Sequence, residues 1–109
     1  MKDLFENQVS QLKEAHFLIL YWTAKAEEKN AKYNITNIFD DLKYSGATRT
    51  KQSAVAFVEA LSLLCFVDVA GEGNRKHLYI TPFGAKALEH LVSNSKFKIK
   101  KSMFLEGNK

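Results

Sequence analysis

Residues 48–83 read TRTKQSAVAFVEALSLLCFVDVAGEGNRKHLYITPF. In the first half of this stretch apolar residues recur at three- and four-residue intervals, which predicts a helix with one buried face. Two short alternating runs, 67–69 and 78–80, then flank a glycine-rich turn, and this pattern predicts a β-hairpin. The pair Thr81-Pro82 predicts a further helix, because Thr is a good N-cap and Pro is favoured at the first helical position. The stretch therefore predicts a helix, a hairpin and another helix in succession.

The helix at the start of this stretch has two different faces. The apolar face, which we expect to be buried, consists of Ala54, Phe57, Val58, Leu61, Leu64 and Cys65. The N-cap is expected at Thr48 or Thr50. At about 100° per residue, Arg49 and Gln52 point away from the apolar face. The first two turns are therefore polar and basic on the outside, which suits a helix that enters a DNA major groove about 12 Å wide.

Before this stretch the chain predicts two more helices. The first is expected over about 4–29, with residues 15–24 at the centre of the core because they are apolar nearly all the way round. Residues 33–35 form a short extended candidate. A second, shorter helix is expected from an N-cap at Thr36 to about Tyr44.

The second helix is expected to place Asp40 and Asp41 on its outer side, away from the core. Ser45-Gly46 then predicts a break, since glycine adopts positive φ without steric cost. Two helices joined by a short turn that contains glycine form the helix-turn-helix pattern.

Alternation and helical spacing assign faces in the rest of the stretch. The hairpin residues expected in the core are Val67, Val69, Leu78 and Ile80. His77 and Tyr79 are expected to face solvent. The buried stripe of the last helix is expected to be Phe83, Ala87, Leu88, Leu91 and Val92.

The chain has 109 residues and a net charge of +4 that is unevenly distributed. Residues 94–109 contain five lysines and a single glutamate, so the excess charge belongs to this tail. Bases without acids gather elsewhere only locally, over 43–58 and 74–84. We expect one domain over 1–109, with its core at about 10–93 and a basic tail at 94–109 that serves for dimerisation or as a DNA-contacting arm. The apolar residues of the tail must pack on the body or on a second subunit.

The predicted order of helix, short extended piece, helix, helix, hairpin and helix resembles the winged helix-turn-helix superfamily. Residues 61–67 and 73–84 bear a closer likeness to transcriptional regulators of the multiple-antibiotic-resistance (MarR) type. There a leucine-rich segment, a charged wing and a Leu-Thr-Pro-x-Gly opening of the next helix follow the recognition helix. The likeness covers about 34–92. It implies an α+β, mostly helical fold with a three-helix core, a β-hairpin wing and an additional C-terminal helix.

The chain departs from the family pattern at several places. Asn74-Arg75 replaces the usual aspartate-arginine pair of the wing, and Ile80 replaces leucine before the Thr-Pro pair. Cys65 or Phe66 stands where a glycine is usual. No long C-terminal dimerisation helix is visible in the sequence.

The resemblance and the local charge pattern select a set of candidate DNA contacts on the predicted recognition helix, the helix before it and the wing. They are Lys43, Thr48, Arg49, Lys51, Gln52, Ser53, Asn74, Arg75, Lys76 and His77. We expect Arg49 and Gln52 to read base edges, from guanine and adenine respectively. Lys43, Thr48 and Lys51 are expected at phosphates. The alternative is a solvated helix start and an ordinary charged hairpin tip.

The residue types and their spacing do not favour a metal site or an active site. The cysteine and the histidines do not have the spacing of metal ligands, and we find no catalytic constellation or phosphate-binding glycine loop. We therefore expect no enzyme activity, cofactor or metal, and a buried core position for both His16 and Cys65. The longest nearly apolar run, 15–24, is too short to cross a membrane. A single cysteine allows no internal disulfide, which favours the cytoplasm.

The leading hypothesis is a homodimeric, sequence-specific regulator of transcription that binds double-stranded DNA. Its dimer surface is expected to comprise Leu4, Phe5, Val9 and Leu12, with Phe97, Ile99, Met103, Phe104 and Leu105 from the tail. The alternative is a winged-helix protein-interaction module without nucleic-acid binding, which the balanced charge of the body favours. A third hypothesis is an RNA- or single-strand-binding domain that uses the lysines of 96–101.

Overall fold

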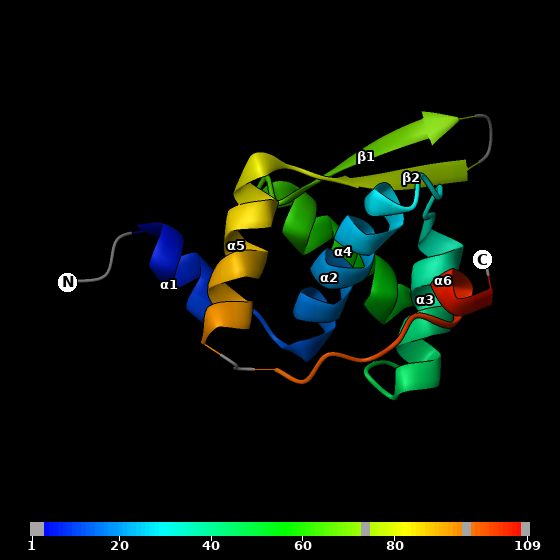
Figure 1. Ribbon diagram of the computed structural model, residues 1–109, viewed down its shortest axis with the longest axis horizontal. Helices are drawn as coiled ribbons and strands as arrows, with labels where there is room; N and C mark the ends of the chain where they lie inside the picture. The colour runs from blue at the N-terminus through cyan, green and yellow to red at the C-terminus, as the bar shows by residue number, and fades with distance from the viewer. Residues whose placement is uncertain (1–3, 73–74, 95–96, 108–109) are drawn as a thin grey trace.

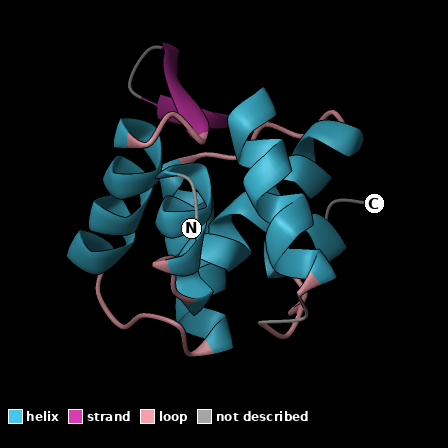
Figure 2. Ribbon diagram, turned by 90° about the vertical axis from the view of Figure 1, so that its left-hand side faces the viewer, coloured by secondary structure: helices cyan, strands magenta, loops and turns pink. Residues whose placement is uncertain are grey.

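The computed structural model describes residues 4–72, 75–94 and 97–107. These residues form six helices and one antiparallel two-stranded hairpin, an α+β fold that is mostly helical (Figure 1). The elements are α1 (Leu4–Ser10), α2 (Glu14–Glu28), α3 (Ile35–Ser45), α4 (Lys51–Leu63), β1 (Val67–Glu72), β2 (Arg75–Ile80), α5 (Pro82–Ser93) and α6 (Met103–Gly107). The hairpin lies at one end of the helical body (Figure 2). No helix within the described ranges is long and apolar enough to cross a membrane.

Helix α2 is the centre of the core, as its all-round apolar pattern predicts. It packs against α3, α4, α5 and β2. Its most deeply buried large apolar side chains are Phe17, Leu18, Ile19, Leu20 and Trp22, each at most 1% exposed.

The predicted single helix over 4–29 is wrong, because the chain breaks between α1 and α2. Lys13 has extended backbone angles (φ −100°, ψ 175°), and its N–H donates to Nδ1 of His16 at 2.9 Å. A side chain at the third helical position that accepts from the N-cap N–H is one half of a capping box. His16 therefore helps to cap the start of a new helix at Glu14, where hydrophobic spacing alone predicts continuation. It is half-buried, with its ring 4.9 Å from that of Phe57.

The start of α3 lies two residues earlier than predicted. Asn34, and not Thr36, is the N-cap, and its side chain accepts from the N–H of Asn37 at 2.8 Å. The predicted end is confirmed, since Ser45 is the last residue and Gly46 follows at φ 83°. That left-handed conformation favours glycine.

The end of α4 contradicts the prediction of a core thiol. The N–H groups of Cys65 and Phe66 donate to the carbonyls of Ser62 and Leu61, a Schellman arrangement that closes the helix. Cys65 occupies its left-handed position at φ 64°, and its side chain is exposed. The αL residue of such a closure faces outward, so the apolar stripe of α4 ends before Cys65.

The hairpin pairs Val67 with Ile80 and Val69 with Leu78. His77 is buried, at 5% exposure, although alternation predicts that it faces solvent. The reason is a third extended segment: Asn34 forms a bridge with His77, and the N–H of Leu78 donates to the carbonyl of Tyr33 at 2.9 Å. Val69, on the other hand, is 36% exposed, because it lies farther out along the hairpin than Val67.

Helix α5 begins as predicted, with Thr81 as N-cap and Pro82 at its first position. Its buried face differs from the predicted stripe, since Phe83 and Val92 are 58% and 46% exposed. Gly84 lies at the close contact instead: a Cβ at this position would be 1.9 Å from the carbonyl oxygen of Phe66. The absence of a side chain thus lets α5 approach the end of α4.

The C-terminal segment 97–107, which we call the strap, packs on the body of the same chain. The ring of Phe97 lies 5.7 Å from that of Phe17, and Leu105 is only 5% exposed in the core. Phe104 lies 5.6 Å from the ring of Tyr33. Phe97, Phe104 and Leu105 thus follow the first of the two predicted alternatives, packing on the body, whereas Ile99 and Met103 stay exposed.

Candidate nucleic-acid interface

The α3–turn–α4 unit is closed by a compact set of hydrogen bonds. The N–H groups of Ala47 and Thr48 donate to the carbonyl of Leu42 at 2.9 and 3.4 Å. Thr50 then caps α4, and its hydroxyl accepts from the N–H of Ser53 at 3.1 Å. The start of α4 is therefore held at a defined position relative to the end of α3.

The predicted contacts at the start of α4 form one exposed surface, except for Thr48. Arg49, Lys51, Gln52 and Ser53 are exposed, whereas Thr48 is 8% exposed and lies in the turn. Thr48 therefore offers little surface to a partner, and its role as a phosphate contact stays a prediction.

The outer face of α4 carries small side chains in its middle part. An open, shallow depression runs along it, lined by Lys51, Gln52, Val55, Ala56 and Glu59. Small side chains in its middle allow close approach of another molecule to the helix, and Glu59 marks its acidic end. Lys43 is exposed on the preceding helix, with its Nζ 5.9 Å from the ring centroid of Phe39.

The predicted contacts in the hairpin are only partly exposed. Lys76 is exposed, and the backbone of Arg75 pairs with that of Glu72. His77 is buried, so the prediction that it faces solvent is wrong, and its role as a DNA contact stays a prediction. Asn74 and the side chain of Arg75 lie outside the described part of the structure.

The basic strap and the basic start of α4 lie on different sides of the molecule. In Figure 1 the strap crosses the front, whereas α4 lies behind α2. Lys98 and Lys101 are exposed on the strap. The strap therefore does not extend the surface of α4, and the local charge of that surface comes from Arg49, Lys51 and Lys43.

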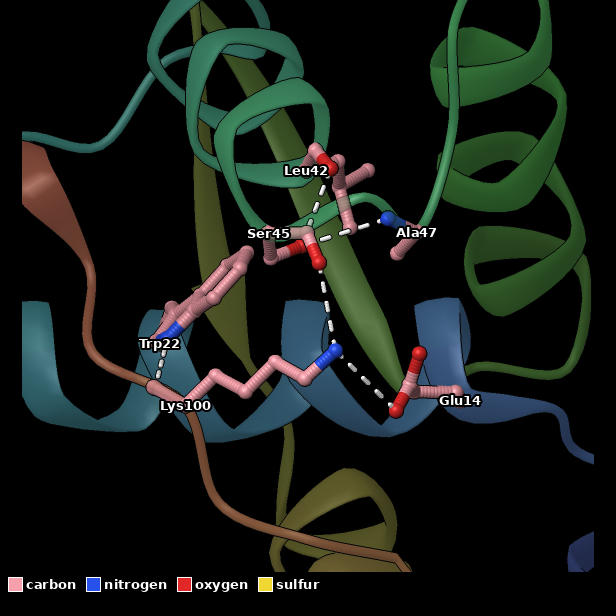
Figure 3. A network of polar contacts seen from close by, with 6 residues as sticks. All are labelled: Glu14, Trp22, Leu42, Ser45, Ala47 and Lys100. Carbon is pink, nitrogen blue, oxygen red and sulfur yellow. Dashed lines mark hydrogen bonds and ion pairs between the residues drawn. The ribbon is translucent and has the colours of Figure 1, made fainter.

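Lys100 is the residue of the strap that sequence reasoning missed most clearly. Its Nζ donates to the carbonyl oxygen of Ser45 at 3.2 Å and lies 3.5 Å from Oε2 of Glu14 (Figure 3). Its own carbonyl accepts from Nε1 of Trp22 at 2.8 Å. In the sequence it is one of several lysines in an alternating run, and no local signal distinguishes it from its neighbours.

Asp41 is the second missed residue, and here the prediction of an outer position is wrong. It is 1% exposed, and its carboxylate accepts from the hydroxyl groups of Tyr33 and Ser102 and from the N–H of Phe104. Burial, reinforced by the negative charge of Asp41, raises the pKa of the Tyr33 hydroxyl. The helical spacing could have indicated this burial, because Asp41 is three residues after the buried Ile38 and lies on the same side of the helix.

The described residues contain no group of three or more His, Cys, Asp or Glu side chains that could hold a metal ion. Asp41 is surrounded by hydrogen-bond donors that belong to the chain itself, so its carboxylate has a structural role. The exposed chemistry of the α4 surface is that of guanidinium, ammonium and amide donors, which suit phosphates and base edges.

Comparison with known proteins adds a likeness of fold. The sequence matches no protein-family model and no curated protein. Among solved structures, the chain is similar to the protein AF1382 from Archaeoglobus fulgidus, with a TM-score of 0.62 and 16% sequence identity. The similarity covers 79% of this chain and 89% of the archaeal one. At this level of identity the likeness shows a shared fold and nothing further.

Proposed function

We propose that the protein is a winged helix-turn-helix regulator of transcription that binds double-stranded DNA. The observation that carries this proposal is the start of α4, which is exposed and basic and has small side chains along its outer face. A hydrogen-bonded turn after α3 presents it, and an antiparallel hairpin follows it. In this reading α4 is the recognition helix and the hairpin is the wing. Within this proposal, the more specific assignment is to transcriptional regulators of the MarR type.

The exposed residues take different roles in this proposal. Arg49 and Gln52 lie toward base edges in the major groove, since their side chains can make bidentate contacts to guanine and adenine. Lys43 and Lys51 hold phosphates on either side, as does Ser53 through its hydroxyl. Lys76 and Arg75 follow the backbone or the minor groove from the wing. No catalytic step and no cofactor is part of the proposal.

The protein is proposed to act as a cytoplasmic homodimer, because a two-fold axis lets two recognition helices read successive major grooves. The surface expected for this dimer needs revision. Val9, Leu12 and Leu105 are buried within the chain, whereas Leu4, Ile99 and Met103 are 73%, 52% and 48% exposed. Only the second group is available to a partner.

An anisotropy titration with random-sequence duplex DNA at low salt tests the proposal. The wild-type chain is expected to bind at micromolar concentration. Non-specific Kd values of DNA-binding proteins are about 10⁻⁴–10⁻⁶ M at physiological salt, and binding tightens as the salt concentration falls. A variant with Arg49, Lys51 and Gln52 changed to Ala should lose most of this binding. The matched control changes Lys98 and Lys101 to Ala on the strap and should retain it. Equal losses in the two variants would contradict the assignment of α4.

A second candidate function, a protein-interaction module, is favoured by a separate observation. The body is balanced in charge, and several large apolar side chains are exposed, among them Tyr44 at 71%, Leu63 at 85% and Phe83 at 58%. Absence of DNA binding at micromolar protein in the same titration would favour this candidate.

A further inference from the structure

The side chain of Lys100 contacts the body of the protein where the strap passes the end of α3. Ser45 is the last residue of α3, and its carbonyl is one of those that a helix leaves without an intrahelical donor. The Nζ of Lys100 supplies that donor, and a cation at a helix C-terminus is also favoured by the helix dipole. The same Nζ lies 3.5 Å from Glu14 at the first position of α2. One ammonium group therefore joins the strap, the end of α3 and the start of α2.

The backbone of the strap is anchored at Lys100 itself and again two residues later. Trp22, which is 1% exposed, holds the carbonyl of Lys100 itself. Two residues later the hydroxyl of Ser102 donates to Asp41, in the last turn but one of α3. Because its main chain is fixed in this way, the side chain of Lys100 reaches Ser45 from a defined point.

Ser45 in turn is part of the turn that leads into α4. Its hydroxyl donates to the carbonyl of Leu42 at 2.9 Å and accepts from the N–H of Ala47 at 3.4 Å (Figure 3). The N–H of Ala47 also donates to the Leu42 carbonyl at 2.9 Å. Gly46 lies between them in the left-handed conformation. A displacement of Ser45 would therefore be passed to Ala47 and to the first turn of α4.

We propose that Lys100 is a positioning residue for the nucleic-acid interface, which it serves by fixing the turn between α3 and α4 from the opposite side of the fold. The consequence for DNA rests on the proposed function above, whereas the tether of the turn does not. Direct contact of Lys100 with DNA fits the structure less well, because its Nζ is engaged by Ser45 and Glu14 and the strap lies away from α4.

The first arm of the test measures the turn in the DNA-free protein. Lys100→Met keeps the length of the side chain and removes the ammonium group, and Lys101→Met makes the same charge change at an exposed neighbour. Hydrogen exchange of the Ala47 amide should become about five- to thirty-fold faster in Lys100→Met and stay unchanged in Lys101→Met. Lys100→Arg should restore slow exchange, because a guanidinium group can also donate to the Ser45 carbonyl. Unchanged exchange in Lys100→Met would overturn the proposal.

The second arm measures DNA affinity and its dependence on salt. If the turn occupies the binding orientation for only part of the time, the apparent Kd rises by the inverse of that fraction. We expect an increase of about three- to tenfold for Lys100→Met with an unchanged slope of log K against log salt, and full rescue in Lys100→Arg. A slope reduced by about 0.9 would show that Lys100 contacts a phosphate directly and would overturn the positioning role. Unchanged affinity in Lys100→Met would overturn it as well.

A stability control separates a local effect on the turn from a general loss of stability. Val9→Ala removes buried volume in α1, on an element distant in sequence from the turn. It should lower the urea midpoint while leaving both the Ala47 exchange and the DNA affinity at wild-type values under native conditions. If the wild-type chain binds no DNA, the proposed function fails, and the exchange arm still decides whether Lys100 holds the turn.

Discussion

The indole Nε1 of Trp22 donates a 2.8 Å hydrogen bond to the carbonyl oxygen of Lys100, which lies 78 positions later in the chain. Trp22 is the only tryptophan of the protein. Its fluorescence therefore reports directly on whether the strap is in place, and several of the expected outcomes below can be followed by this signal.

Leu105→Ala should destabilise the protein by about 2 kcal/mol or more, because a buried Leu loses contacts and leaves a cavity. Leu105 is 5% exposed, whereas Met103 on the same helix is 48% exposed, so Met103→Ala is a matched control with a much smaller expected effect. Urea unfolding followed by Trp22 emission measures both. Identical midpoints for the two variants would show that the strap does not contribute to the core.

Asp41→Ala should destabilise the fold by about 2 kcal/mol or more, since it leaves the Tyr33 hydroxyl, the Ser102 hydroxyl and the Phe104 N–H without their acceptor. The neighbouring Asp40 is exposed, and Asp40→Ala should stay within about 0.5 kcal/mol of wild type. Chemical denaturation at neutral pH compares the pair. Unchanged stability in Asp41→Ala would contradict the hydrogen-bonded role of the buried carboxylate.

Stability should fall as the pH drops below about 6.5. Burial and, to a smaller extent, the charge of Lys13 lower the pKa of His16 from its ordinary value of 6.5. The unfolded chain therefore takes up this proton first, and stability that is present above pH 6.5 is lost as the pH falls toward the folded-state pKa. Protonation would also remove the Nδ1 acceptor that starts α2.

His16→Gln isolates this effect. The Gln side chain can accept from the Lys13 N–H as in a capping box, yet it does not titrate. Urea midpoints at pH 5 and pH 7.5 should differ less in the variant than in wild type. The variant is expected to be less stable at pH 7.5, because it loses the ring contact with Phe57. An equal pH dependence in both proteins would exclude His16 as its source.

Gly84→Ala should cost about 2 kcal/mol or more, because its Cβ would lie 1.9 Å from the backbone carbonyl of Phe66, where no flexible side chain can yield. Gly71 has open space around the corresponding position, so Gly71→Ala should change stability by no more than about 0.5 kcal/mol. Thermal or urea unfolding of the two variants provides the comparison. If both were neutral, α5 would not be held against the end of α4 as described.

The proposed DNA contacts differ in what their removal should do. Arg49→Ala should weaken binding to the preferred sequence by about 1–3 kcal/mol and relax specificity at one base pair. Lys51→Ala should weaken all sequences alike and reduce the salt slope by about 1. Anisotropy titrations with matched and mismatched duplexes at several salt concentrations distinguish the two. Small and equal effects would argue against α4 as a recognition helix.

The sequence predicts those parts of the fold that depend on neighbouring residues. Thr50 and Thr81 cap their helices, and Gly46 ends α3, because each acts through backbone groups within a few positions. The exposed, basic start of α4 is likewise a local property of a helix face, and Arg49, Lys51, Gln52 and Ser53 are exposed as expected.

The errors at His77 and Asp41 have a different cause, which is burial decided by segments far apart in the chain. His77 is covered because Asn34 pairs with it, and Asp41 is buried because the strap supplies its donors. The break before α2 depends on one imidazole nitrogen that accepts a backbone N–H, a detail that hydrophobic spacing does not record. Lys100 could not be singled out among the tail lysines, since only the path of the folded strap brings it to Ser45.

The exposed Cys65 has a practical consequence. It is the only thiol in the chain, and it lies in the closure that joins α4 to the hairpin. A maleimide fluorophore or spin label would therefore attach at one site without any engineered cysteine. Such a label, placed at the far end of α4 from Arg49, could report the approach of a ligand while leaving the proposed contact residues unmodified.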